Sequence, residues 1–147
     1  GIGIDDSRVQ RKLLAKMLGL CGIHDDKTRI LGKSNEEIME FENIMLSTVR
    51  ENPEDFVFVI VDENLDIDGD DTPFTISGSH SVERVRKLLN SEEEARLLCL
   101  VRSANDSKDD LALYSSRAHG YIPKGPVLKR DSLLELIAPW WIERFGD

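Results

Sequence analysis

The stretch FVFVIVDENLDIDGDD, residues 56–71, joins an apolar run to an acidic one. Residues 56–61 are all apolar, Asp62 follows them directly, and four more aspartates follow Asp62. A run that is apolar at every position is typical of a central strand in a parallel sheet, because helices cover both faces of such a strand. The carboxylate at its end is then a solvated turn residue, a metal ligand or a nucleophile at the edge of a buried sheet.

Composition limits the classes of protein to consider. The chain has 147 residues, a formal net charge of −9 and a pI near 4.8. This length suits one domain, 1–147, and the acidic charge argues against nucleic acid or an anionic membrane as a direct partner. Cys21 and Cys99 are isolated among apolar residues, so we expect reduced core thiols in a cytoplasmic protein. The chain opens on a candidate strand, GIGID, and we expect a domain from a longer protein.

The hydrophobic pattern alternates between strand and helix along the chain. The predicted strands lie at 1–5, 28–32, 56–61, 97–101 and 120–123, and the predicted helices at 7–19, from 34, at 79–90, at 107–117 and from about 131. Pro139 is expected to kink or divide the last helix. Five repeats of strand then helix, with an irregular acidic loop after Asp62 and no two-residue hairpin, predict an α/β fold with a parallel sheet covered on both faces.

The residues just after the predicted strands indicate a site. In an open parallel sheet, ligands bind beyond the carboxyl ends of the strands. Asp5 and Asp6, Asp62, Ser103 and Lys124 stand at those positions. Clustered carboxylates repel one another unless they share a cation, and carboxylate oxygens suit Mg²⁺. A cation, an ammonium and a hydroxyl could hold phosphoryl oxygens while one carboxylate attacks phosphorus in line.

Four short motifs at these positions resemble those of the receiver domain of two-component response regulators. They are DDS at 5–7, VDENL at 61–65, RSA at 102–104 and GYIPK at 120–124. The resemblance covers nearly the whole chain, with the motifs in the right order. It implies a flavodoxin-like, doubly wound sheet of five parallel strands in the order 2-1-3-4-5.

The resemblance also implies a role for each acidic residue of the site. Asp62 corresponds to the phosphoacceptor. Asp5, Asp6 and Asp62 correspond to ligands of Mg²⁺ or Mn²⁺, and the backbone carbonyl of Asn64 completes that metal shell.

The remaining roles implied by the resemblance concern the phosphoryl group itself. The Ser103 hydroxyl is expected to bond a phosphoryl oxygen, and the Lys124 ammonium to pair with the group. Tyr121 stands at the aromatic position that turns inward as the hydroxyl moves, which is a two-state switch.

The family implies partners as well. A histidine kinase or a histidine phosphotransfer protein would donate the phosphoryl group, and the resemblance is compatible with a hybrid histidine kinase as the parent chain. An output domain or partner protein would bind the face formed by helix 107–117, strand 120–123 and the last helix. Such a domain is not a turnover enzyme, since it catalyses only its own phosphorylation and dephosphorylation.

Three departures from the family pattern stand out. The family has proline directly after the lysine, whereas this chain reads KGP, which leaves the peptide isomer at Gly125–Pro126 open. The loop after Asp62 is longer and carries an acidic insertion, DIDGDDTPFT at 66–75, beside the expected phosphorylation site. The first strand is short and contains two glycines.

Two other functions remain possible on these residues. A phosphatase of the haloacid dehalogenase type also places an aspartate after a parallel strand, but it needs a second aspartate where this chain has Asn64. A receiver-like docking module without phosphorylation is the other, and the KGP segment favours it. His24, His80 and His119 share no metal-ligand spacing and are expected at the surface, while the paired tryptophans at 140–141 are expected in the core.

Overall fold

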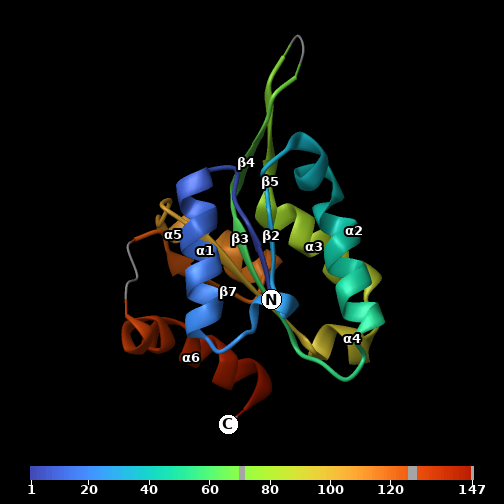
Figure 1. Ribbon diagram of the computed structural model, residues 1–147, viewed down its shortest axis with the longest axis vertical. Coiled ribbons are helices and arrows are strands. Elements are labelled where there is room, and N and C mark those ends of the chain that lie inside the picture. Colours follow the sequence, from blue (N-terminus) through green and yellow to red (C-terminus); the bar gives the residue numbers. More distant parts are fainter. Residues whose placement is uncertain (70–71, 126–128, 147) are drawn as a thin grey trace.

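The computed structural model describes residues 1–69, 72–125 and 129–146, and its centre is a parallel sheet (Figure 1). The strands are β1 (Ile2–Ile4), β2 (Arg29–Leu31), β3 (Val57–Asp62), β6 (Leu97–Ser103) and β7 (Gly120–Pro123). They pair in parallel in the order β2-β1-β3-β6-β7. Counted among the strands of this sheet, the order is 2-1-3-4-5, so the predicted flavodoxin-like, doubly wound α/β fold is confirmed.

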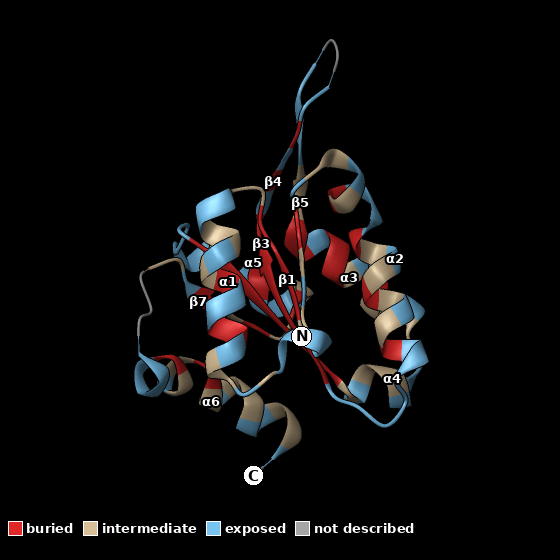
Figure 2. Ribbon diagram, in the orientation of Figure 1, coloured by how far each residue is buried: buried red, intermediate tan, exposed pale blue. Residues whose placement is uncertain are grey.

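Helices cover both faces of the sheet, and the five longer ones have buried residues on their inward sides (Figure 2). The helices are α1 (Arg8–Leu20), α2 (Asn35–Glu51), α3 (Gly78–Leu88), α4 (Ser91–Ala95), α5 (Lys108–Arg117) and α6 (Arg130–Phe145), with a short 3₁₀ turn at Asp25–Lys27. One buried cluster joins α1 and α6 to one face of the sheet, and another joins α2, α3 and α5 to the other. Among the described residues, no helix has the length and apolar character that a membrane span requires.

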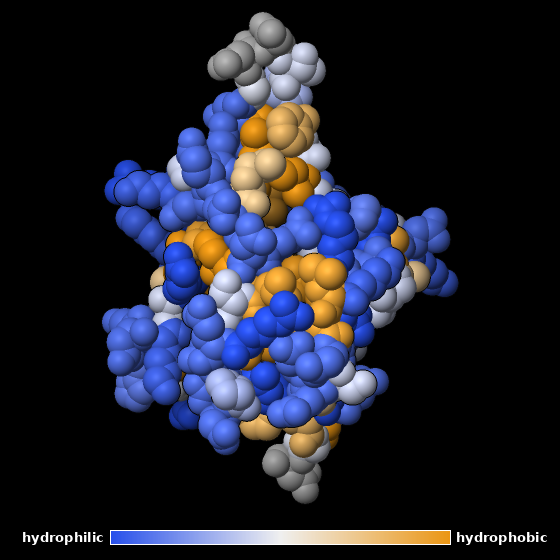
Figure 3. Space-filling view, turned by 90° about the vertical axis from the view of Figure 1, so that its right-hand side faces the viewer, coloured by the Kyte–Doolittle hydropathy of each residue, from blue (hydrophilic) through white to orange (hydrophobic). Residues whose placement is uncertain are grey.

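The acidic insertion differs from the predicted irregular loop, because both of its ends belong to the paired strands of a hairpin. β4 (Asn64–Ile67) pairs antiparallel with β5 (Phe74–Ser77), and this two-stranded sheet projects from the domain (Figure 1). Apolar side chains lie on the projecting segment below its tip (Figure 3). Both strands alternate polar and apolar residues, which is the period of a strand with one buried face. The high aspartate content of the segment hid this period.

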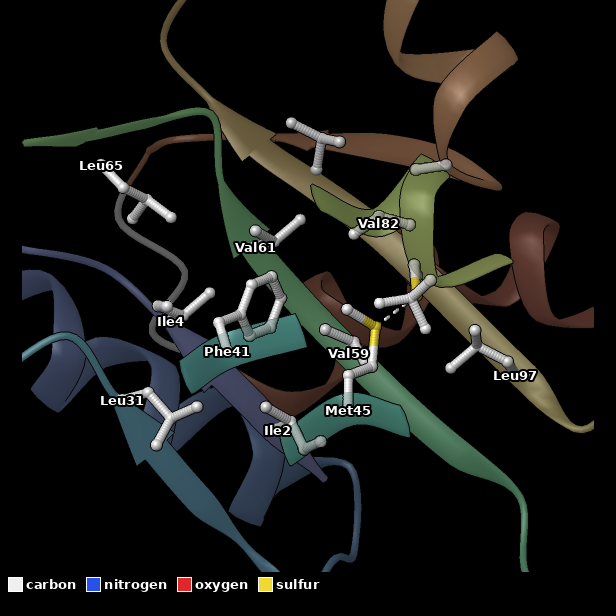
Figure 4. Packing of buried hydrophobic residues seen from close by; sticks show 14 of the residues in the cluster. Ile2, Ile4, Leu31, Phe41, Met45, Val59, Val61, Leu65, Val82 and Leu97 are labelled. Carbon is white, nitrogen blue, oxygen red and sulfur yellow. Dashed lines mark hydrogen bonds between the residues drawn. The ribbon is translucent and has the colours of Figure 1, made fainter. Parts of the chain in front are cut away.

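The apolar run in β3 is explained by burial on both faces. Each residue of β3 is buried. Val59 and Val61 face α2, where they pack near Phe41 and Met45 (Figure 4). Phe58 and Ile60 face the cluster of α1 and α6 on the other side of the sheet. Each strand of this kind removes apolar area from water on two sides, at roughly 25 cal/mol per Å², and so the run needs no polar position until it reaches the site.

Three smaller differences concern helices. The helix predicted over 79–90 ends at Leu88, and α4 follows because Asn90 and Glu93 form a capping box. Pro139 does not divide α6, which is continuous from Arg130 to Phe145. The spacing of Val9, Leu13 and Met17 in the sequence also predicts that these residues share one helical face, yet Val9 is exposed.

His119 was predicted at the surface, and this prediction is wrong. Its ring is buried, and its Nε2 lies 2.8 Å from Glu94, which also accepts hydrogen bonds from Arg86 and Arg144. The backbone N–H of Cys99 donates to His119 Nδ1 at 2.9 Å, which places the ring proton on Nε2. Burial lowers the pKa of His119 to about 4, so the ring is neutral at physiological pH. The cluster ties α3, α4 and α6 together at the end of the sheet where β6 and β7 begin.

Gly32 is the position where backbone geometry controls the start of the site. Its φ is 113°, and a Cβ there would lie 2.0 Å from the carbonyl oxygen of Asp5. We predict that Gly32→Ala destabilises the protein by about 2 kcal/mol or more, because the substitution adds strain and displaces the Asp5 backbone. Chemical denaturation measures this change.

Gly19 provides the matched control for this substitution. It lies within α1, and a Cβ there meets nothing within 4 Å. Gly19→Ala should therefore be neutral or stabilising by about 0.5–1 kcal/mol. Equal effects of the two substitutions would contradict the close approach of Gly32 to Asp5.

Candidate functional site

Three carboxylates meet at the carboxyl ends of two neighbouring strands. Asp5 and Asp6 follow β1, and Asp62 is the last residue of β3. One oxygen from each lies within 4.8 Å of the others. β1 and β3 are hydrogen bonded in parallel, with Ile4 opposite Val61, so the sheet itself places these side chains together. Their oxygens could hold a metal ion, and Mg²⁺ prefers such ligands.

Lys124 joins this cluster from β7, which is two strands away from β3. Its ammonium lies 3.0 Å from Asp62 Oδ1 and 3.1 Å from Asp5 Oδ2. The side chains of Asp5, Asp62 and Lys124 are 2%, 7% and 19% exposed. One ammonium therefore bridges two carboxylates that are almost removed from water. The structure brings all four charged residues predicted for the site together.

Burial and mutual repulsion change the protonation of the cluster. The pKa of Asp62 rises to about 6, because its carboxylate is buried and lies near Asp5, although the hydrogen bond from Lys124 opposes this rise. The pKa of Asp6 is also raised by burial. Burial alone would lower the pKa of Lys124, but the hydrogen bonds to Asp62 and Asp5 and the charges of these two carboxylates together outweigh burial and raise it. At neutral pH the cluster thus contains an ionised Asp62 and a charged ammonium.

Backbone N–H groups fix two of the carboxylates. Ser7 N–H donates to Asp5 Oδ1 at 2.9 Å, at the entrance to α1. Asp66 N–H donates to Asp6 Oδ2 at 2.9 Å, and so β4 of the hairpin is attached to a residue of the cluster. Asn64, at the start of β4, is exposed, and its role as a carbonyl ligand stays a prediction.

Ser103 ends β6, and its contacts identify a residue that sequence reasoning missed. Its Oγ accepts hydrogen bonds from the Tyr114 hydroxyl at 3.2 Å and from Asn105 N–H at 3.1 Å. Tyr114 comes from α5 and is buried. Tyr121, the predicted switch aromatic, is half-buried and packs against Trp140 with ring centroids 5.2 Å apart. Only the folded chain places Tyr114 on Ser103, since eleven residues separate them.

Arg102 is a second residue that the sequence did not single out. It is buried, one guanidinium nitrogen donates to Gln10 at 2.6 Å, and another donates to the carbonyl of Gly125 at 3.3 Å. Burial lowers its pKa, while the charges of Asp5 and Asp62 oppose this effect. Arg102 thus adds positive charge near the cluster and holds the backbone next to Lys124. The isomer of the Gly125–Pro126 peptide, which the sequence leaves open, lies outside the described residues.

Glu63, directly after Asp62, belongs to a separate buried network. Its carboxylate accepts from the hydroxyls of Ser77 and Ser79, each at 2.9 Å, and from Ser79 N–H. Arg117 of α5 reaches the same two hydroxyls. Gly78 N–H donates to the Glu63 carbonyl at 2.8 Å, and a Cβ at Gly78 would meet the Asp62 carbonyl. The network closes the base of the hairpin beside the cluster.

Comparison with solved structures places this arrangement in a known fold. A CheY-like response regulator receiver domain from Methanospirillum hungatei JF-1 is similar, with a TM-score of 0.60, 19% identity, and coverage of 97% of this chain and 93% of that one. The beryllofluoride-activated NtrC4 receiver domain has a TM-score of 0.61 and 16% identity, with coverage of 97% of this chain and 96% of that one. A chain of the CheX–CheY–BeF₃–Mg²⁺ complex from Borrelia burgdorferi has a TM-score of 0.59 and 15% identity, with coverage of 94% of this chain and 85% of that one. No family model and no curated protein matches the sequence. The chain has the fold of response regulator receiver domains.

The raised pKa of Asp62 gives a stability prediction. The folded state holds the Asp62 proton up to about pH 6 and the unfolded state only up to 3.8, so this group lowers stability as the pH rises through that window. Asp62→Asn should therefore stabilise the metal-free protein by about 1–3 kcal/mol near neutral pH. Denaturant unfolding with a chelator present measures the difference.

The pH dependence provides the control for this prediction. The advantage of Asp62→Asn should shrink toward zero as the pH falls to about 4, where the wild-type carboxyl is protonated. An advantage that stays constant from neutral pH to pH 4 would contradict the raised pKa.

Proposed function

We propose that this domain accepts a phosphoryl group from a phosphohistidine onto Asp62, and that the new phosphoryl group changes a protein-binding face. The observation that carries this proposal is the Lys124 ammonium held between Asp62 and Asp5, with Asp6 beside them. This set supplies a nucleophile, a cation site and a positive charge for the incoming group. The receiver fold supports the same reading.

The chemistry assigns a separate task to each side chain. An Asp62 carboxylate oxygen forms the new bond to phosphorus, while the bond from phosphorus to the histidine nitrogen breaks and its electron pair returns to the imidazole. Asp5, Asp6 and Asp62 would hold Mg²⁺ or Mn²⁺, which neutralises charge on the phosphoryl oxygens when bound. Lys124 pairs with one of those oxygens. Its present contact with Asp62 Oδ1 keeps the ammonium next to the reacting atom.

Ser103 and Tyr114 would form the switch. We propose that the Ser103 hydroxyl turns away from Tyr114 when it bonds a phosphoryl oxygen. A buried tyrosine hydroxyl without a partner is costly, so α5 would move to satisfy it. The switch would then reach the face made by α5, β7 and α6, which we propose as the surface for an output domain or partner protein. A histidine kinase or phosphotransfer protein would approach Asp62 from the cluster side.

A receiver-like docking module without phosphorylation is the second candidate. Lys124 bridges two of the three carboxylates, and Arg102 adds a second buried positive charge near Asp5 and Asp62. These charges partly neutralise the cluster without a metal ion, and a module of this kind would keep the fold for binding alone. The phosphatase alternative still lacks its second aspartate, since Asn64 stands there.

Incubation with acetyl phosphate and Mg²⁺ distinguishes these functions. We expect the wild-type protein to gain one phosphoryl group by intact mass, because Asp62 is ionised and paired with Lys124. Asp62→Asn should gain none. Glu63→Gln serves as the matched control, since Glu63 is the neighbouring buried carboxylate but lies in a separate network.

The opposite results have clear meanings. A folded wild-type protein that gains no phosphoryl group and binds neither Mg²⁺ nor beryllofluoride would reject the phosphoacceptor function in favour of the docking module. Continuous release of phosphate from acetyl phosphate, without accumulation of modified protein, would indicate a phosphatase.

Tyr114→Phe tests the proposed switch. Without the tyrosine hydroxyl, Ser103 gives up no hydrogen bond when it turns toward the phosphoryl group. We therefore expect the affinity for beryllofluoride in Mg²⁺ to rise about fivefold, the worth of one net hydrogen bond. Titration followed by NMR measures this affinity.

Tyr121→Phe is the matched control for Tyr114→Phe. The Tyr121 ring packs on Trp140, and its hydroxyl makes no hydrogen bond within the described residues. Its loss should change the affinity little. A larger effect at Tyr121 than at Tyr114 would identify Tyr121, as the sequence predicts, as the switch aromatic.

A further inference from the structure

The backbone of the hairpin reveals an unused strand edge. Asp66 and Thr75 lie opposite each other in the antiparallel pair of β4 and β5. Asp66 N–H donates to Asp6 Oδ2 and therefore points away from β5. Opposed residues in an antiparallel pair either exchange both hydrogen bonds or neither, so the N–H and C=O of Thr75 also point outward. Within the described residues, no backbone group bonds to them.

The two edges of the hairpin differ in their environment. The β4 edge is covered, because Asp6 accepts from Asp66 and the Asn35 side chain bonds both backbone groups of Asp68. The β5 edge is exposed, and Phe74 keeps 50% of its surface in water. An open edge of this kind is a template for pairing with another strand.

Apolar side chains lie on one face beside the open edge. Leu65 is opposite Ile76 and Ile67 is opposite Phe74, so these four residues share a face of the hairpin. Leu65 and Ile67 are buried, whereas Phe74 is exposed and Ile76 is half-buried. The apolar surface on the hairpin (Figure 3) therefore includes the side chains of Phe74 and Ile76 beside the open edge of β5, and a further strand could cover them.

Charge decides which strand fits this edge. Residues 64–77 contain four aspartates and neither lysine nor arginine. A second copy of the chain would bring the same aspartates and the same net charge of −9 to the contact. Like charges across an interface reduce affinity, whereas a basic segment gains affinity and a faster association rate. The acidic hairpin therefore disfavours self-pairing and favours a positively charged partner.

We propose that the outer edge of β5 is a docking edge for an extended segment of a partner protein, in which basic residues alternate with apolar ones. The segment would add a third strand to the hairpin through the N–H and C=O of Thr75. Its apolar side chains would cover Phe74 and Ile76, and its lysines or arginines would lie on the face of Asp66. This edge adjoins the carboxylate cluster through Asp6, but its contacts do not depend on phosphorylation.

Titration with a model strand tests the docking edge. The probe is a peptide of about ten residues that alternates lysine and valine, the composition the edge should recognise. The protein is isotope-labelled Asp62→Asn without metal, so the result is independent of the phosphoacceptor function. We expect saturable NMR shifts centred on the amides of residues 74–77, and a loss of these shifts at high salt.

Two variants at Thr75 isolate the backbone contact. Thr75→Pro removes the outward N–H and leaves the bonds between β4 and β5 intact, and it should weaken binding about tenfold. Thr75→Val is the matched control, since it also loses the hydroxyl bond to Asp66 but keeps the N–H. Phe74→Lys, which keeps every backbone group, adds a repelling charge and should weaken binding as well. It decides the test if the proline variant distorts the hairpin.

Several results would overturn the proposal. The first is the absence of saturable shifts at residues 74–77 up to about 5 mM peptide. The second is equal binding by Thr75→Pro and Thr75→Val, provided that Phe74→Lys also binds like the parent protein. The third is equal binding of a peptide with glutamate in place of lysine. Sedimentation would also overturn it if the wild-type protein self-associates and the proline variant does not, since the edge would then bind a second copy.

Discussion

The ammonium of Lys124 between Asp5 and Asp62 is the interaction on which the rest of the site depends. Parallel strands gather the residues that follow them at one end of the sheet, and here they gather three carboxylates. Without a cation, burial and mutual repulsion would raise the pKa of these carboxyl groups, and some of them would stay protonated. Lys124 supplies that cation from β7, two strands away from β3. The strand order of the sheet is therefore also what makes the charge arrangement possible.

Much of the fold could be predicted because β3 and β6 are apolar on both faces. Such runs occur in parallel sheets covered by helices, and they also locate the polar residues that end them. The cluster of Asp5, Asp6, Asp62 and Lys124 followed from that rule. The hairpin was missed although Asn64–Ile67 and Phe74–Ser77 alternate with a period of two, because four aspartates in the segment favoured a loop.

Contacts between distant segments could not be predicted from the sequence. Tyr114 lies on a helix with no local signal that it would bond Ser103. The sequence around His119 predicts a surface residue, because it gives no sign that Glu94 and the Cys99 backbone bond to the ring. In each case the deciding partner comes from another element, and pattern and spacing carry no information about it.

The base of the hairpin has a consequence for how the chain tolerates change. The chain leaves β3 at Glu63 and returns at Gly78, and these two residues are hydrogen bonded to each other. The hydroxyls of Ser77 and Ser79 also donate to the Glu63 carboxylate and stabilise this junction. Changes in length between Ile67 and Phe74, the last paired residues of the hairpin, would therefore leave Asn64 and Asp66 in place beside Asp62. Insertions and deletions here change the reach of the domain toward other proteins while its chemistry stays in place.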